Sequence, residues 1–237
     1  MTPVFILVRP QLAENVGTAA RAMMNCALAE MRLVDPDEDP LCSRAIAASS
    51  GADEILRNTK IFKTVEEAVA DLQKVYATTG RPRDMIKPVF TGQGMAKDIQ
   101  ARQAQGIKCG VMFGPERTGL GNEDVAYADA IVNIPLNPKH CSLNLAQAVL
   151  LTGYEIFRLT DSTAEEYLAT PNTVPADKTE LEHLFTHLED ELEQVGYFRS
   201  PEKKPRMMRN LRSIFLRADL TSQDVRTLHG VITDLRR

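Results

Sequence analysis

Short apolar runs alternate with helical patterns along the first 160 residues of this 237-residue chain, and this alternation limits the possible folds more than any other feature. The runs are rich in β-branched side chains, and they predict strands at residues 4–8, 31–34, 75–77, 110–113 and 131–134. Helical patterns lie between them, at residues 16–27, 44–49, 65–72, 97–105, 123–128 and 143–159. Short apolar strands of this kind suit a parallel sheet that is buried on both faces. We therefore predict an α/β domain with a mostly parallel sheet and helices on both faces.

The character of the chain changes near residue 162. Residues 168–177 (LATPNTVPAD) contain two prolines, two threonines and an asparagine, which is typical of a linker. Only helical patterns follow, at residues 177–195, 201–218 and 220–235, and Thr221, Ser222 and Asp224 form a plausible cap for the last helix. We predict an α/β domain over residues 1–162, a linker over 163–176, and a small all-helical C-terminal extension over 177–237.

Charge is unevenly distributed in this extension. Residues 180–193 carry six acidic side chains and no Lys or Arg, whereas residues 199–217 carry seven basic side chains and Glu202. Such a run can be a solvated helix face. A net charge of +6 over 19 residues, within a chain of net charge −4, favours contact with phosphate groups. The candidates for this contact are Arg199, Lys203, Lys204, Arg206 and Arg209.

The sequence argues against a membrane protein or a metalloprotein. No stretch approaches the roughly 20 apolar residues that a membrane span needs, and residues 4–8 are too short for a signal-peptide core. We expect a cytoplasmic protein without a membrane partner. His183 and His187 could share a metal on one helix face, but without a third nearby ligand we expect no metal site.

The cysteine residues form no C-x-x-C pair, and their spacing fits no zinc site. We interpret them as reduced thiols, three of which we expect to be buried. The four residues are Cys26, Cys42, Cys109 and Cys141.

Two clusters of special residues follow predicted strands, at the edge where open parallel sheets bind ligands. The first cluster is residues 14–21 (ENVGTAAR). In it, Asn15 could cap a helix, Gly17 allows close approach of another chain, and Arg21 follows on the helix. The second, residues 113–121 (FGPERTGLG), has the glycines and proline of a sharp loop. It is neither a dinucleotide fingerprint nor a P-loop, so neither a Rossmann cofactor nor ATP is indicated.

A third cluster, residues 134–146 (IPLNPKHCSLNLA), joins the last predicted strand to an apolar helix. Ser142 and Asn144 lie at the junction between the loop and the helix. Ser142 could simply cap the helix. The two prolines and the polar run also suit a ligand-binding loop, so both interpretations stay open on these residues alone.

Together the three clusters resemble the motifs of the SPOUT class of methyltransferases, in its TrmH-like branch. The resemblance covers roughly residues 1–160, and its specificity lies in the combination and order of the motifs. The C-terminal extension, called the tail below, is similar to that of the TrmJ subgroup. Members of this subgroup methylate the ribose 2′-hydroxyl of the nucleotide at tRNA position 32. The matching residues are Asn15-x-Gly17 with Arg21, Phe113-Gly-x-Glu116-x-x-Gly119-Leu120, Ser142-Leu-Asn144-Leu, and Phe198-Arg199-x-Pro201-x-Lys203-x-Pro205-Arg206.

The resemblance implies a C-terminal trefoil knot in the α/β domain, an obligate homodimer, and S-adenosylmethionine as the cofactor, with no metal. Cys141 stands where relatives often carry a small polar residue, which matters little if the backbone meets the cofactor there. The cofactor-binding residues implied by the resemblance are Thr79, Gly80, Gly114, Ile134, Leu136, Cys141, Ser142 and Leu143.

Arg21 is the catalytic residue that the resemblance implies, with Asn15, Glu116, Ser142 and Asn144 orienting the reacting groups. Arginine stays protonated in proteins and is therefore a poor base. A guanidinium can instead grip a phosphate and stabilise a developing alkoxide. A phosphate oxygen or Ser142 could then take the proton.

The function predicted from these features is methyl transfer to the 2′-hydroxyl of cytidine or uridine at position 32 in the tRNA anticodon loop. One alternative is the same chemistry on ribosomal RNA. Another is an inactive RNA-binding dimer, against which the intact motif residues speak. A nucleotide-dependent dehydrogenase is a distant third, because the dinucleotide fingerprint is absent.

Overall fold

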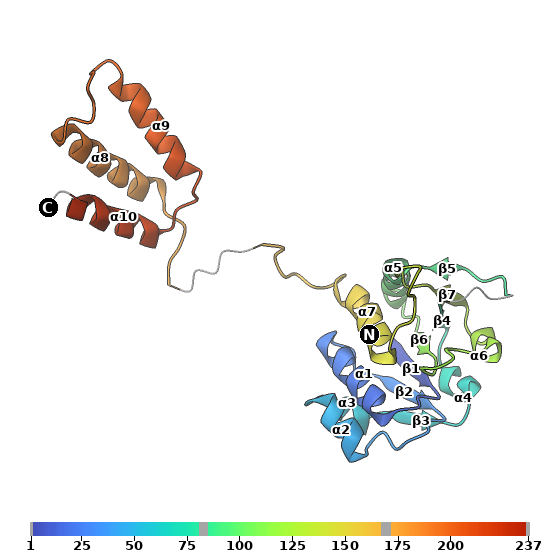
Figure 1. Ribbon diagram of the computed structural model, residues 1–237. Coiled ribbons are helices and arrows are strands. Elements are labelled where there is room, and N and C mark those ends of the chain that lie inside the picture. Colours follow the sequence, from blue (N-terminus) through green and yellow to red (C-terminus); the bar gives the residue numbers. More distant parts are fainter. Residues whose placement is uncertain (1, 81–84, 167–171, 236–237) are drawn as a thin grey trace. The chain divides into compact units, whose positions relative to one another are not determined.

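The computed structural model describes residues 2–80, 85–166 and 172–235. The chain divides into two compact units, Met1–Thr163 and Ala164–Arg237, which are drawn in Figure 1 and described one at a time. Among the residues described, no helix is long and apolar enough to cross a membrane.

The first unit is built on a parallel sheet, as predicted. In the described part of the chain the sheet has seven strands in the order β3-β2-β1-β6-β4-β7-β5, and every neighbouring pair is parallel. The four strands β1, β6, β4 and β7 are neighbours in this order, so their carboxyl ends lie along one stretch of the sheet edge. The strands are β1 (Val4–Val8), β2 (Met31–Val34), β3 (Lys60–Phe62), β4 (Lys74–Thr78), β5 (Val89–Phe90), β6 (Cys109–Phe113) and β7 (Ala130–Val132).

Helices cover both faces of the sheet, which confirms the predicted layers. Alternate residues of β1 face opposite sides, because side chains alternate along a strand. Phe5 and Leu7 belong to a core shared with α1, α2, α3, α5 and α7, whereas Ile6 and Val8 belong to a second core shared with α4 and α6. The helices are α1 (Ala13–Asn25), α2 (Ser43–Ser49), α3 (Asp53–Arg57), α4 (Val65–Val69), α5 (Gly92–Gln103), α6 (Asn122–Ala126) and α7 (Leu145–Phe157).

Periodicity in the sequence did not predict α3, β3 or β5. The two strands form the edges of the sheet, and they are three and two residues long. An edge strand has neighbours on one side only and needs no apolar run, so periodicity does not detect it. In β3, Lys60 and Ile61 are exposed. The five residues of α3 are likewise too few to show a helical period.

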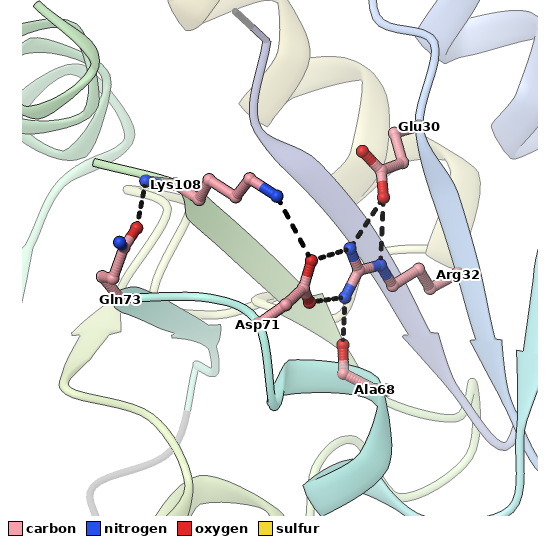
Figure 2. A network of polar contacts seen from close by, with 6 residues as sticks. All are labelled: Glu30, Arg32, Ala68, Asp71, Gln73 and Lys108. Carbon is pink, nitrogen blue, oxygen red and sulfur yellow. Dashed lines mark hydrogen bonds and ion pairs between the residues drawn. The ribbon is translucent and has the colours of Figure 1, made fainter. Parts of the chain in front are cut away.

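Arg32 ties together chain segments near the amino-terminal ends of three strands (Figure 2). It is 3% exposed, and its guanidinium donates to the Ala68 carbonyl at 2.7 Å, to Asp71 at 2.5 Å and to Glu30 at 2.7 Å. The Lys108 ammonium lies 3.6 Å from Asp71. The hydrogen bond from Arg32 lowers the pKa of Asp71 to about 2. This network lies at the opposite edge of the sheet from the strands' carboxyl ends.

The thiols are free, and two of them are buried rather than the three expected. Cys26 and Cys109 are buried, and burial raises the pKa of both thiols. Cys42 is half-buried, because it directly precedes the short surface helix α2, on which Arg44 and Ile46 are exposed. Cys141 is exposed.

The second unit contains α8 (Lys178–Gln194), α9 (Lys204–Leu216) and α10 (Ser222–Leu235), close to the three predicted helices. Leu181, Leu184, Phe185 and Val225 form its buried core. The expected cap of the last helix is confirmed, because the Asp224 backbone N–H donates to Oγ1 of Thr221 at 3.3 Å and the Thr221 N–H donates to the Asp224 carboxylate at 2.8 Å.

The segment of residues 174–176, just before α8, is hydrogen-bonded to residues at the start of α10. The Ala176 N–H donates to the Leu220 carbonyl, and the Ser222 N–H donates to the Val174 carbonyl, both at 2.9 Å. The last residues of the predicted linker therefore pack within the helical unit. Residues 167–171 of that linker lie outside the described residues.

Candidate active site

A cavity of about 490 Å³ lies at the carboxyl ends of β6, β4 and β7. The loops that follow these strands form it, as expected for an open parallel sheet. All eight residues predicted to bind the cofactor line this cavity, together with Glu116. The eight are Thr79, Gly80, Gly114, Ile134, Leu136, Cys141, Ser142 and Leu143.

Glu116 joins the loop after β6 to the beginning of α1. Its carboxylate accepts a hydrogen bond from Nδ2 of Asn15 at 2.6 Å and another from the Gln11 backbone N–H at 3.0 Å. The expectation that Asn15 caps the helix is wrong, because α1 begins at Ala13 and Leu12 occupies the capping position without a side-chain bond. Asn15 lies inside the first turn, so its amide is available to Glu116.

Asn144 connects the third motif to the first. Its Nδ2 donates to Oδ1 of Asn15 at 2.9 Å, while its own Oδ1 accepts from the Ala146 N–H at 2.8 Å. Gln147 completes a capping box by accepting the Asn144 backbone N–H at 3.1 Å. Asn144 therefore caps α7, and Ser142 does not. Ser142 is exposed and lines the cavity.

The loop after β6 is tightly folded. The Gly119 N–H donates to the Pro115 carbonyl at 2.8 Å, and Gly119 has a φ of +67°, where glycine is favoured. A Cβ on Gly114 would lie 2.1 Å from the backbone nitrogen of Leu120. Only glycine fits at residue 114, which explains why this motif begins as it does.

The cavity wall is chemically mixed. Ile134, Leu136 and Leu143 are half-buried and present apolar surface, while Thr79 and Ser142 add hydroxyl groups. Pockets for small organic molecules commonly have volumes of about 300–1,000 Å³ and combine apolar walls with a few polar groups. Such a wall can hold a flat ring against its apolar side chains and orient the polar substituents of the ring through its hydroxyl groups.

Arg21 lies apart from this network. It is exposed on α1, it is not among the residues that line the cavity, and it makes no hydrogen bond or ion pair with any residue that the structure describes. The structure thus places Glu116 and Ser142 in the cavity wall and links Glu116 to Asn15 and Asn144 by hydrogen bonds. It leaves the Arg21 guanidinium available to another molecule.

Arg9 and Asp124 were missed by the sequence analysis. Arg9 directly follows β1, and its guanidinium donates to the carboxylate of Asp124, which is 5% exposed in the first turn of α6. The signal was present in part, because Arg9 directly follows a predicted strand. The pairing itself spans 115 positions, and no local pattern reveals it.

Four of the five basic candidates in the tail are exposed, and none of the four forms an ion pair within the described residues: Arg199, Lys203, Arg206 and Arg209. Lys204 differs, because it forms ion pairs with Glu189 at 3.0 Å and Glu193 at 2.5 Å. Arg212 pairs similarly with Glu182 at 2.5 Å. Part of the charge asymmetry therefore holds α9 against α8.

Two histidines of the tail, His187 and His229, form a pair between helices. Nδ1 of His187 on α8 lies 2.8 Å from Nδ1 of His229 on α10, and the rings stack with their centroids 5.0 Å apart. Burial, His187 and His183 lower the pKa of His229. Within the described residues, no group of three or more His, Cys, Asp or Glu side chains could hold a metal ion.

Comparison with known proteins identifies the class of enzyme. Residues 2–154 match the SpoU rRNA Methylase family, and residues 179–237 match the C-terminal domain of the tRNA methyltransferase TrmJ. The chain belongs to the SpoU family of methyltransferases and, within it, to the TrmJ group. The tRNA (cytidine/uridine-2′-O-)-methyltransferase TrmJ of Escherichia coli O6:K15:H31 is 33% identical over 238 residues, covering 98% of this chain and 94% of that protein.

Solved structures agree with this assignment. TrmJ from Z. mobilis ZM4 is 43% identical and superimposes with a TM-score of 0.85, covering 100% of both chains. A probable methylase family protein from Haemophilus influenzae Rd KW20 is 28% identical, with a TM-score of 0.62, and the match covers 98% of this chain and 94% of that one. An AdoMet-bound rRNA methyltransferase from Sinorhizobium meliloti, 22% identical with a TM-score of 0.53, shares the fold over 68% of this chain and 57% of its own.

Proposed function

We propose that this enzyme transfers a methyl group from S-adenosylmethionine to the ribose 2′-hydroxyl of cytidine or uridine at position 32 of the tRNA anticodon loop. The observation that carries the proposal is the cavity, which gathers all eight predicted cofactor residues beside the Glu116–Asn15–Asn144 network. The name of the TrmJ relative from Escherichia coli supports tRNA and the two pyrimidine nucleosides.

The cavity is chemically suited to S-adenosylmethionine. Ile134, Leu136 and Leu143 offer apolar surface for an adenine ring, and the backbone groups of the three loops offer donors and acceptors. The AdoMet-bound relative from Sinorhizobium meliloti shares the fold and supports this choice. When bound, the cofactor supplies a methyl group attached to a sulfonium, so no metal and no covalent nucleophile is needed.

The residues of the chain have separate tasks in this proposal. The network of Asn15, Glu116 and Asn144 holds the loops rigid, so that the acceptor hydroxyl can be aligned with the methyl carbon. Arg21 grips the phosphate of the target nucleotide and stabilises the charge that develops on the 2′-oxygen. The hydroxyl proton passes to a phosphate oxygen, either directly or through Oγ of Ser142, which then gives its own proton to that phosphate.

The exposed basic residues of the tail add contacts to tRNA phosphates. Arg199, Lys203, Arg206 and Arg209 have no ion-pair partner in the described part of the chain, so they are available to an anion. Such contacts carry no sequence information, and they position the substrate. Choice of the nucleotide then depends on the fit at the cavity.

We also propose that the enzyme is a homodimer and that the loop before α7 forms a trefoil knot. Exposed apolar side chains on two contacting helices support a dimer: Met24 (42% exposed) on α1, and Leu150 (41%), Leu151 (39%) and Tyr154 (52%) on α7. A dimer through α1 would also bring Arg21 to the subunit interface.

Sedimentation tests the dimer. The wild-type protein should sediment as a dimer, Tyr154→Asp should dissociate it, and the control Ile61→Asp, on the edge strand β3, should not. A monomeric wild-type protein would contradict this.

The experiment that tests the function is methyl transfer from labelled S-adenosylmethionine to unmodified tRNA and ribosomal RNA transcripts. Nuclease digestion and mass spectrometry then locate the product. The proposal predicts a single 2′-O-methyl nucleotide at tRNA position 32. If only ribosomal RNA is labelled, the substrate is ribosomal RNA and not tRNA. If no methyl group is transferred and no cofactor binds, the protein is better described as an inactive RNA-binding protein.

A further inference from the structure

The loop that lines the cavity after β6 is fixed at two points, and only the first belongs to the recognised motifs. Glu116 anchors its beginning to Asn15 and to the Gln11 backbone. Its end is anchored by Asp124, whose Oδ2 accepts the Gly121 N–H at 2.8 Å and also a hydrogen bond from the Arg9 guanidinium. The Asp124 side chain is 7% exposed, so this carboxylate is largely shielded from water.

Arg9 is held in an unusual backbone conformation. Its φ is +46°, in the left-handed region that L-residues with a side chain rarely adopt. The Arg9 N–H donates to the Val34 carbonyl at 2.7 Å, which keeps the backbone in place at the carboxyl edge of the sheet. Glycine would fit this conformation without strain. Strained residues cluster at functional sites, where the surrounding structure maintains them.

We propose that the Arg9–Asp124 ion pair positions the loop of residues 114–121 for cofactor binding, an inference that rests on the proposed function of the cavity. Residues 114–119 line the cavity directly. The loop contains Gly114, Gly119 and Gly121, and glycine loses more conformational freedom on ordering than any other residue. The second anchor, at Asp124, orders the loop before the cofactor binds. The free energy of cofactor binding is then not reduced by the entropy cost of ordering the loop.

The charges around the pair fit this role. Asp124 is the hydrogen-bond partner of Arg9, and Asp35, the residue after β2, adds a second negative charge nearby. The hydrogen bond to Asp124 and both carboxylates raise the pKa of Arg9, against the opposing effect of burial. An arginine guanidinium stays protonated in proteins, so Arg9 contributes a full positive charge to the pair.

The test uses Arg9→Gln, Asp124→Asn and Arg9→Lys in the full-length protein. Four quantities are measured: the dissociation constant of S-adenosylmethionine by calorimetry, KM and kcat for methyl transfer, and Tm without cofactor. Losing one charge-assisted hydrogen bond should weaken cofactor binding and raise its KM by about 5–30-fold, while kcat at saturating cofactor stays within about twofold. Arg9→Lys keeps the charge and should recover part of the affinity. Asp124→Asn retains an oxygen for the Gly121 N–H, so its effect isolates the ion pair.

The matched control is Asp71→Asn, which weakens the Arg32–Asp71 pair at the opposite edge of the sheet (Figure 2). It should lower Tm and leave the cofactor dissociation constant unchanged. If Asp71→Asn weakened cofactor binding as much as Arg9→Gln for the same fall in Tm, the effect would be one of general stability. That result would overturn the inference.

Hydrogen exchange of the cofactor-free proteins supplies a readout that does not depend on the identity of the ligand. Arg9→Gln should speed exchange of the amides in residues 114–121 and leave those of β6 unchanged. Unchanged exchange in this loop would overturn the positioning role even if the wild-type enzyme methylates tRNA. Wild-type protein that binds no S-adenosylmethionine, with the loop loosened as predicted, would refute the proposed function and the cofactor role of the pair, because the loop would then serve another purpose.

Discussion

Nδ2 of Asn15 donates a hydrogen bond of 2.6 Å to Oε1 of Glu116, across 101 positions of the sequence. This contact joins the first two motifs, and the bond from Asn144 to Asn15 joins the third. The motifs are therefore one hydrogen-bonded structure at the carboxyl edge of the sheet. Their order along the chain follows from the order of the strands that carry them.

Replacing Glu116 should loosen the cavity loop. Glu116→Ala removes the acceptor for both Asn15 and the Gln11 N–H, and hydrogen bonds to charged groups contribute about 1.5–3 kcal/mol each. We expect the loss to lower kcat/KM by about 10–100-fold, with cofactor affinity falling in parallel. Glu116→Gln should retain more activity, because its Oε1 can still accept from Asn15. The control Glu123→Ala changes an exposed carboxylate on α6 and should have wild-type kinetics.

Arg21 should be needed for catalysis and dispensable for folding. Arg21→Ala should lower kcat by about 10²–10³-fold, as is typical for removal of a group that stabilises transition-state charge. Its Tm should stay close to that of the wild type, because Arg21 is exposed and makes no contact that the described residues record. Arg21→Lys should retain some activity if charge alone matters.

An Arg21→Lys variant as inactive as Arg21→Ala would instead show that the planar guanidinium is required. Lys97→Ala provides the control, since it removes an exposed cation from α5 in the same unit. Wild-type kcat in Arg21→Ala would contradict the catalytic role.

The four exposed basic residues of the tail (Arg199, Lys203, Arg206 and Arg209) should control tRNA affinity and not cofactor affinity. Arg206→Ala combined with Arg209→Ala removes two exposed cations, so the slope of log affinity against log salt should become shallower by roughly 1–2. Filter binding of tRNA at several salt concentrations measures this slope. Arg226→Ala, on α10, is the control with an exposed arginine elsewhere in the tail. An unchanged slope in the double variant would remove these residues from the RNA contact.

The α8–α10 contact should weaken in mild acid. The pKa of His229 is lowered in the folded protein, so the unfolded state binds the proton more readily. This contribution to stability is complete above the unfolded pKa of about 6.5 and declines as the pH falls below it. Hydrogen exchange of α8 and α10 in the full-length protein should therefore reveal lower protection at pH 5 than at pH 7.5. His229→Asn should reduce this difference; an identical acid response in that variant would assign it to other groups.

Much of the sheet could be predicted because its central strands are buried on both faces. Val4–Val8 and Met31–Val34 have the predicted bounds. Every residue of the first is apolar, and Arg32 is the one polar residue of the second, which agrees with burial on both faces. The edge strands β3 and β5 could not be predicted, because exposure on one side removes the apolar signal. The predicted starts of α1 and α7 differ from the observed starts by a few residues. The capping residue depends on contacts between residues that are distant in sequence, such as that of Asn144 with Asn15.

The candidate site was predictable where the motif itself determines the backbone. Gly114 and Gly119 are required by the tight loop, so their pattern could be read directly. The Arg9–Asp124 pair joins residues far apart in the chain, and Lys204 resembles its exposed neighbours until its pairing with α8 is known. Charge alone did not separate the cations that stabilise the tail from those free to meet RNA.

The most direct test of the central claim compares two tRNA molecules that differ by one oxygen atom. One carries cytidine at position 32 and the other carries 2′-deoxycytidine there, and both are incubated with enzyme and labelled S-adenosylmethionine. The account predicts one methyl group per molecule for the first and none for the second, with similar binding of both. Equal labelling of the deoxy-substituted tRNA would contradict the claim, because the acceptor would then be another group.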